Sequence, residues 1–257
     1  MSMHGTLFAK TKSFVGKETR LRAFTVALGL TALGSIASFV TFLVLRGVLS
    51  EAFGDPLPGL VYKFRMRGVQ WGFTGFVLAY LLVTREWERY VRFRRPRLAD
   101  GAWVLVGLFG LNAMTEVEKV VVPRLGLSLE TISGAPLQSV PLSTWPLAWP
   151  LVFAGLYLLP AMVEEQFYRG LIQTRLRGTF STVSEIVFAA GFFSLSHQLY
   201  IVGGGPEMMA TGAVHFFAQG LVFCVLYERS DNLFVPATVH ALSWTSAYAI
   251  LTGLIGL

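Results

Sequence analysis

The sequence has little charge and almost no cysteine. Asp, Glu, Lys and Arg make up 14% of its 257 residues, while 54% are apolar and the mean hydropathy is +0.59. A soluble domain of this length carries about twice that charge and fewer uninterrupted apolar runs. The single cysteine, Cys224, lies inside an apolar run, which excludes a disulfide framework and a cysteine-ligated metal knuckle. We interpret Cys224 as a small, buried apolar residue.

The sequence also lacks the alternating apolar and polar pattern of a membrane β-barrel. It contains long apolar runs instead, and residues 24–45 supply 22 positions without a charge. About 20 such residues are needed for one helix to cross a bilayer. A spanning segment must satisfy its backbone hydrogen bonds internally, so these runs predict helices. The expected fold is all-α, a polytopic bundle of transmembrane helices with an active site in its core.

About seven spans are expected, and residues 117–129 are a candidate for an eighth membrane-associated helix. We divide the chain into N-terminal helices and loops (1–150) and a catalytic core (151–257). Between them, residues 133–150 are rich in proline and predict an interfacial loop with Trp145 and Trp149 at headgroup depth. The seven spans are residues 24–45, 69–84, 102–115, 151–177, 182–202, 210–227 and 233–257.

The basic residues predict the orientation of the chain. With an uncleaved first helix and the N-terminus in the cytoplasm, fifteen of the 21 Lys and Arg residues fall inside. Lys63, Arg65 and Arg67 oppose this assignment, and an odd error in the span count would reverse the second half. The net charge of +6 lies mostly in short loops, which indicates contact with anionic lipid headgroups and no nucleic acid partner. The composition, rich in Ala, Gly, Leu, Val and Arg, favours a bacterial inner membrane.

Two adjacent carboxylates, Glu164 and Glu165, lie at the middle of the span 151–177. An ionised group at the centre of a membrane helix costs about 2.5–3.5 kcal/mol on insertion scales and usually marks function. Glu165 and Arg169 are four residues apart and share a helix face, so they can pair. Glu164 points about 100° away and has no partner on its own helix. The alternative is that the helix ends at Val163 and the carboxylates lie in a cytoplasmic loop.

Two further spans each carry a histidine at a compatible depth. His197 lies within the span 182–202, and His240 lies a few residues from the midpoint of the span 233–257. A lone membrane histidine usually hydrogen-bonds between helices. A carboxylate beside imidazoles in a low-dielectric cavity can instead hold a water molecule and take its proton. The three residues together indicate hydrolysis inside the membrane.

These residues carry a resemblance to a known family. Glu164-Glu165-x-x-x-Arg169, Phe193-x-x-x-His197, the Phe217-x-x-Gly220 approach and a helix with His240 resemble the CPBP family, or Abi family, of CAAX proteases and bacteriocin-processing enzymes. This family of polytopic membrane endopeptidases includes the type II CAAX prenyl endopeptidases. The resemblance covers residues from about 150 to 250.

The resemblance implies that Glu164 and His197 activate the attacking water, while His240 stabilises the oxyanion. It also implies that Glu165 and Arg169 hold these groups in place. The family often has Asn or Asp four residues after the last histidine, where this chain has Trp244. The indole donates one hydrogen bond and accepts none. Either this branch builds its oxyanion hole differently, or the protein has lost peptidase activity.

Metal dependence is open on chemistry alone, because Glu164, His197 and His240 are a possible zinc ligand set. No His-Glu-x-x-His motif is present, and we favour a metal-free, glutamate-type site without a cofactor. His215 either lines the cavity or, as the more common case, makes an interhelical hydrogen bond. Glu116, Glu118 and Lys119 are expected to form a solvated helix end.

The sequence thus favours an intramembrane endopeptidase of the cell membrane, with a membrane-associated protein or peptide as substrate. The alternatives are a non-catalytic immunity or scaffold protein of the same fold, favoured by Trp244, and a transporter or proton relay. No inverted repeat supports the transporter.

Overall fold

The computed structural model describes residues 19–133 and 147–245, and this part of the chain is helical without a strand. Long apolar runs form the long helices, and glycine, proline and charged residues lie at the breaks between them. The elements, in chain order, are α2 (Arg20–Phe53), α3 (Gly59–Met66), α4 (Gly68–Thr84), α5 (Trp87–Tyr90), α6 (Leu98–Arg124), α7 (Glu130–Ser133), α8 (Trp149–Phe153), η2 (Ala154–Leu158), α9 (Leu159–Glu165), η3 (Gln166–Gln173), α10 (Thr174–Leu176), α11 (Thr182–Ile201), η4 (Val202–Gly204), α12 (Gly205–Ser230) and α13 (Phe234–Ser243).

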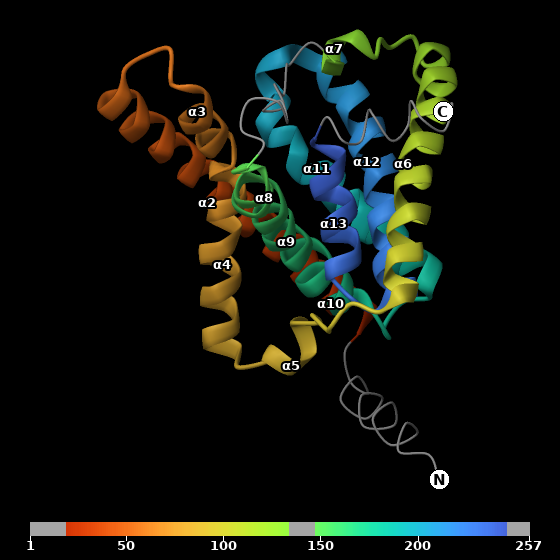
Figure 1. The fold of residues 1–257 in the computed structure, drawn as a ribbon. Coiled ribbons are helices and arrows are strands. Elements are labelled where there is room, and N and C mark those ends of the chain that lie inside the picture. The colour runs from red at the N-terminus through yellow and green to blue at the C-terminus, as the bar shows by residue number, and fades with distance from the viewer. Residues whose placement is uncertain (1–18, 134–146, 246–257) are drawn as a thin grey trace.

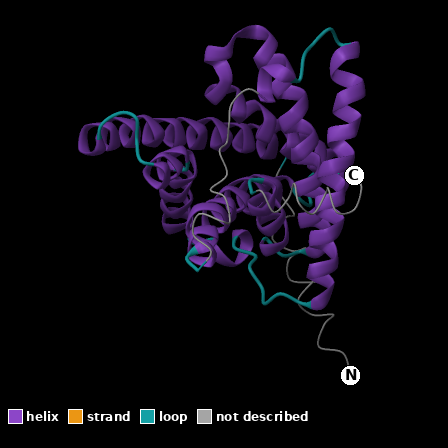
Figure 2. Cartoon of the chain, turned by 45° about the horizontal axis from the view of Figure 1, so that its top comes forward, coloured by secondary structure: helices purple, strands orange, loops and turns teal. Residues whose placement is uncertain are grey.

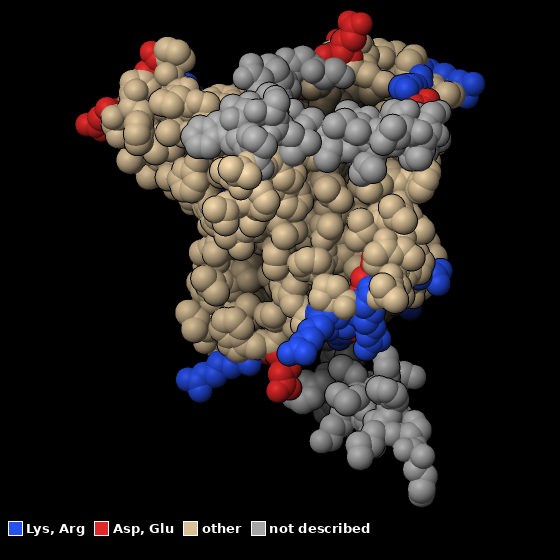
Figure 3. Space-filling model, viewed as in Figure 1, with Lys and Arg blue, Asp and Glu red and all other residues tan. Residues whose placement is uncertain are grey.

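The composition and surface of the helices are those of a membrane protein. Three helical stretches are long and apolar enough to cross a bilayer, namely 20–53, 98–124 and 182–230, the last of which folds back on itself at η4. Large apolar side chains such as Leu33 and Leu105 are more than half exposed on these helices. Figure 3 shows the result on one face of the molecule, a broad band without charge between two charged ends. Such an apolar surface is stable in contact with lipid tails, and it is larger than the apolar patches that soluble proteins expose to water.

The helical run from α8 to α10 lies between two groups of helices (Figure 1). On one side, α4 packs on both α2 and α9. On the other side, α13 packs on α9 and α6, while α11 and α12 form an antiparallel hairpin. The hairpin is tight because Gly220 lets α12 approach the backbone of Ala190 on α11. Figure 2 shows from a second view that the described chain consists of helices joined by loops. Residues on the central run therefore face both groups of helices.

Two sequence predictions about helix boundaries are settled by this architecture. The helix that carries the carboxylates continues past Val163 to Leu176, so the alternative of a cytoplasmic loop after Val163 is wrong. Residues 117–124 are the last turns of α6, so the separate eighth helix at 117–129 is also wrong. Apolar side chains and the buried Glu118 continue the packing surface of α6 through this segment, which explains why the helix does not break there.

The last predicted span is shorter than expected in the part that can be described. Helix α13 ends at Ser243, and Trp244 has left the helical conformation with φ −85° and ψ 0°. His240 therefore lies in the last turn of a ten-residue helix and not near the middle of a long one. The remainder of the span, residues 246–257, lies outside the described residues, as do most of the N-terminal segment and the predicted interfacial loop with Trp145.

Candidate active site

The two carboxylates lie on a helix that is locally widened. The run from Trp149 to Leu176 is continuous, but π-helical turns flank α9 on both sides, as η2 and η3. Pro160 at the start of α9 lacks an N–H group, and the wider turn before it accommodates the missing hydrogen bond. After the carboxylates, the backbone N–H of Thr174 donates to the carbonyl of Arg169 five residues earlier, which is the π register, and the hydroxyl of Thr174 donates to the same carbonyl. Such π-turns occur most often at functional sites.

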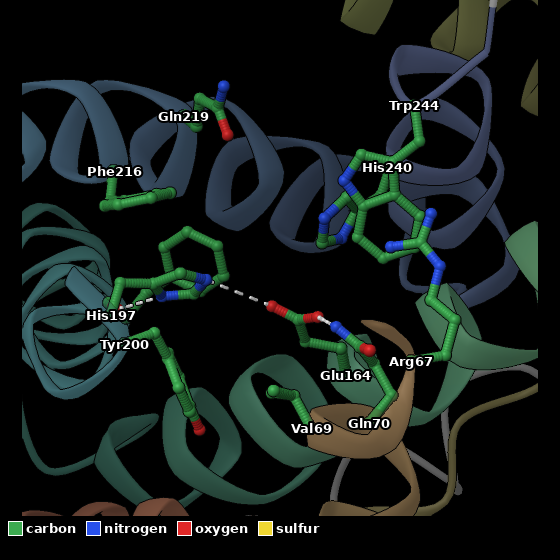
Figure 4. A pocket seen from close by; sticks show the side chains of 11 residues that line it. Arg67, Val69, Gln70, Glu164, His197, Tyr200, Phe216, Gln219, His240 and Trp244 are labelled. Atoms are coloured by element: carbon green, nitrogen blue, oxygen red, sulfur yellow. Dashed lines mark hydrogen bonds and ion pairs between the residues drawn. The ribbon is translucent and has the colours of Figure 1, made fainter. Parts of the chain in front are cut away.

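Glu164 is 1% exposed and its two oxygens have different partners. Oε2 accepts a hydrogen bond of 2.7 Å from Nε2 of Gln70 on α4. Oε1 lies 3.5 Å from Nε2 of His197 on α11. Figure 4 shows the carboxylate between these two side chains. The amide orients Glu164 so that one oxygen faces the imidazole.

The backbone sets the tautomer of His197. Its Nδ1 lies 2.8 Å from the carbonyl oxygen of Phe193, four residues earlier on the helix. Because a carbonyl can only accept, Nδ1 must carry the proton. When the ring is neutral, the lone pair of Nε2 therefore points towards Oε1 of Glu164. Two acceptors that face each other require a shared proton or a donor molecule between them. The first and last residues of the Phe193-x-x-x-His197 motif are the two ends of this hydrogen bond.

A second buried network holds His240. Its Nδ1 lies 2.8 Å from Oε1 of Glu165, and the guanidinium of Arg169 is paired with the same carboxylate, with Nε 3.1 Å from Oε2. Glu165 and Arg169 are fully buried. Arg169 also donates to the carbonyl of Gly220 at 3.2 Å and lies over the ring of Phe193. Buried charges of opposite sign satisfy each other in this way, and Nδ1 of His240 becomes the donor to the carboxylate.

Both networks border one cavity of about 190 Å³ at the centre of the bundle. Trp244 lies at the edge of this cavity, with its ring 4.2 Å from that of His240. The indole of Trp244 also contacts Arg67, whose guanidinium carbon lies 3.8 Å from the centre of the ring (Figure 4). The cavity is lined by Arg67, Val69, Gln70, Glu164, Phe193, His197, Tyr200, Phe216, Gln219, His240 and Trp244.

The structure brings together the residues selected from the sequence. Glu164, His197, His240 and Trp244 all line the cavity, and the pair of Glu165 and Arg169 lies behind His240. The zinc alternative remains a hypothesis. Within the described ranges, no three His, Cys, Asp or Glu side chains are grouped as a metal-ligand set.

Two polar cavity residues from the N-terminal half, Arg67 and Gln70, are not predicted from the sequence. Gln70 was hidden in an apolar span, and nothing in the sequence near it signals a site. Arg67 was counted as a charge on the outer side, where it opposed the positive-inside assignment. It is 6% exposed and lies at the break between α3 and α4, so its side chain points into the protein. The sequence does contain one signal for a buried role of Arg67, namely that this residue contradicts the positive-inside rule. The cavity draws on both halves of the chain.

His215 takes the more common of its two predicted roles. Its Nδ1 lies 2.8 Å from Oε2 of Glu118, which links α12 to α6, and it does not line the cavity. The same contact corrects the prediction for Glu118, which is 4% exposed and not part of a solvated helix end. Glu116 and Lys119 form an exposed pair, but α6 continues to Arg124, so the predicted helix end at these residues is wrong. Cys224 is buried, as predicted.

Comparison with known protein families agrees with these motifs. Residues 145–245 match the family of type II CAAX prenyl endopeptidase Rce1-like proteins. The match covers 101 of the 257 residues and supports an assignment to the CPBP/CAAX protease family. The matched segment contains both carboxylates and both histidines of the cavity, while Arg67 and Gln70 lie outside it. No curated protein and no solved structure matches the chain. Together with the long apolar helices, the match supports a membrane protein that is similar to the CAAX proteases.

Proposed function

We propose that this protein is a glutamate-type intramembrane endopeptidase that hydrolyses a peptide bond in a membrane-associated protein or peptide. The observation that carries the proposal is Glu164, a buried carboxylate that is oriented by Gln70 and lies 3.5 Å from Nε2 of His197 at a cavity. A water molecule that donates one hydrogen to Oε1 and the other to Nε2 satisfies both acceptors. Its own lone pair then points away from them, towards a substrate carbonyl.

The reaction follows general-base hydrolysis. The water oxygen attacks the carbonyl carbon and forms a C–O bond, while its proton passes to Glu164 and the π electrons move to the carbonyl oxygen. The tetrahedral oxyanion needs a donor on the opposite side of the cavity, where His240 lies. When the intermediate collapses, the C–N bond breaks and the proton moves from Glu164 to the leaving amine. We propose that the site works without a metal, with the carboxylate as the base.

The proposed reaction does not require a prenyl group on the substrate. We therefore define the substrate only as a protein or peptide at the membrane. A non-catalytic role rests on one feature, Trp244 at the family's usual Asn or Asp position. The buried polar groups argue against that role. Each unpaired or charged group in a membrane interior is costly to retain, and a scaffold has no use for Glu164 facing His197 across a cavity.

Replacement of the base tests the proposal. Glu164→Gln keeps the shape and the contact with Gln70 but cannot take a proton, so we expect loss of cleavage with normal folding. The termini of membrane and surface proteins are compared by mass spectrometry in cells with the wild type, Glu164→Gln or a deletion.

The control is Glu116→Gln, which changes an exposed carboxylate on α6 in the same way. Uncut proteins that accumulate in the Glu164→Gln and deletion cells, but not in the wild type or the Glu116→Gln control, identify the substrate. Normal processing by Glu164→Gln would disprove the assignment of Glu164 as the base.

A further inference from the structure

The wall of the cavity beside His240 and Trp244 carries a fixed positive charge, that of Arg67. Arg67 is 6% exposed, and among the described residues no carboxylate lies within ion-pair distance of its guanidinium. Its Nε donates to the carbonyl of Leu156 at 2.9 Å, and its guanidinium lies on the face of Trp244. The remaining four N–H groups have no other hydrogen-bond partner in the described part of the chain. A buried cation with unused donors at a cavity wall is ready to bind an anion.

The other candidate donor has a limitation. Nδ1 of His240 donates to Glu165, so a neutral His240 presents the lone pair of Nε2 to the cavity. In that state the ring can accept a hydrogen bond but cannot donate one to an oxyanion. The guanidinium of Arg67 keeps its protons throughout. The arginine therefore supplies the donor and charge that a neutral His240 lacks.

We propose that Arg67 is a catalytic residue that donates hydrogen bonds to the oxyanion of the tetrahedral intermediate. Trp244 is its positioning residue. The large indole, which replaces the usual small polar side chain of the family, contacts both Arg67 and His240 and holds them on the same side of Glu164 (Figure 4). The oxyanion hole is thus built from the N-terminal half of the chain. This inference rests on the proposed endopeptidase function.

The expected effect is on turnover. Removal of one oxyanion donor typically lowers kcat by about 10²–10³-fold. Arg67→Ala should show such a loss, and methylguanidinium added to this variant should restore part of the rate. Arg67→Lys keeps the charge but not the forked geometry, so we expect an intermediate rate. The control is Arg65→Ala in α3, two residues before Arg67, because the side chain of Arg65 does not line the cavity.

The assay uses full-length protein in vesicles of phosphatidylethanolamine and phosphatidylglycerol. The probe is a detergent extract of membranes from the Glu164→Gln cells, which contains the uncut substrates. New termini are counted by mass spectrometry over time and at several dilutions of the extract. Thermal unfolding and gel filtration verify that each variant is folded. If Arg67→Ala does not fold, the cleavage rate of Arg67→Lys is compared with the wild type instead.

The outcomes separate the two proposals. Slow cleavage by Arg67→Ala at every dilution, with rescue by methylguanidinium and a normal rate for Arg65→Ala, supports an oxyanion donor. A rate that recovers in concentrated extract would mean that Arg67 binds a group of the substrate, and would overturn the inference. Unchanged cleavage by both Arg67 variants, with Glu164→Gln inactive, would overturn it while the peptidase function stands. Identical termini from the wild type and Glu164→Gln would reject the peptidase function, and the inference with it.

Discussion

At the scale of single residues, neighbouring carboxylates have different environments. Glu164 faces the cavity with a neutral amide and an imidazole as partners, while Glu165 is enclosed by Arg169 and His240. A rotation of about 100° between consecutive helical positions separates the two environments. Glu164 directs one carboxylate oxygen at the cavity, whereas the carboxylate of Glu165 is paired with Arg169. The geometry therefore favours Glu164 over Glu165 as the base.

The buried pair of Glu165 and Arg169 should be a strong stability determinant. Glu165→Gln leaves the fully buried Arg169 without a counter-charge, and breaking such a pair costs about 3–5 kcal/mol. We expect a lower unfolding free energy in detergent. The double variant Glu165→Gln, Arg169→Met should be less destabilised than the sum of the two single variants, because it removes both charges.

The control for this measurement is the exposed pair of Glu116 and Lys119, whose oxygen and nitrogen are 2.6 Å apart. Since exposed pairs contribute about 0–1 kcal/mol, Glu116→Gln should change the unfolding free energy little. Equal effects of Glu165→Gln and Glu116→Gln would show that the buried pair does not stabilise the fold.

At the scale of helices, the site depends on the close approach of α2 and α4. A Cβ atom added to Gly72 would overlap the backbone of Ser38, so only glycine fits at this crossing. Gly72 is two residues from Gln70, which orients Glu164. The position of α4 relative to α2 therefore sets the position of the amide at the carboxylate.

A single methyl group tests this crossing. Gly72→Ala should push the helices apart and cost about 1–3 kcal/mol of unfolding free energy, with reduced cleavage as Gln70 moves. Gly75→Ala in the same helix meets no atom within 4 Å and should be neutral or stabilising by up to about 1 kcal/mol. Thermal unfolding and the terminus assay are measured for both variants. Equal behaviour of the two would contradict a tight helix crossing.

At the scale of the whole molecule, the charged ends differ. The end formed by α5 and its connections carries a cluster of arginines, visible as blue at the lower end in Figure 3. Part of the cluster is bound within the protein, since Arg94 pairs with Asp100 and Arg92 with Asp231. Arg89 also pairs with Glu86, while Arg85 and Arg95 are exposed and can face anionic lipid, which is typical of a cytoplasmic surface.

This asymmetry predicts a cytoplasmic location for α5. In a Cys224→Ser background, Glu88→Cys on α5 should react with a membrane-impermeant maleimide only after the cells are permeabilised. Glu130→Cys on α7, which lies at the opposite end in Figure 1, should react in intact cells. The reverse labelling pattern would place the N-terminal half in the opposite orientation.

Much of the fold and half of the site were determined by the sequence itself. Uninterrupted apolar runs specify membrane helices because lipid cannot satisfy exposed backbone groups, so helix α11 was predicted within one residue. Glu164, His197 and His240 were identifiable because ionisable groups at membrane depth are too costly to lie there without a role. Neither argument depends on how the helices pack.

Other features were decided only by tertiary structure. Gln70 carries no charge and breaks no local rule, so its contact with Glu164 exists only because α4 packs against α9. The inward direction of Arg67 follows from the break between α3 and α4, and its place on Trp244 follows from the early end of α13. These contacts join residues far apart in the chain. Their distances depend on helix crossings and breaks, which local sequence patterns do not encode.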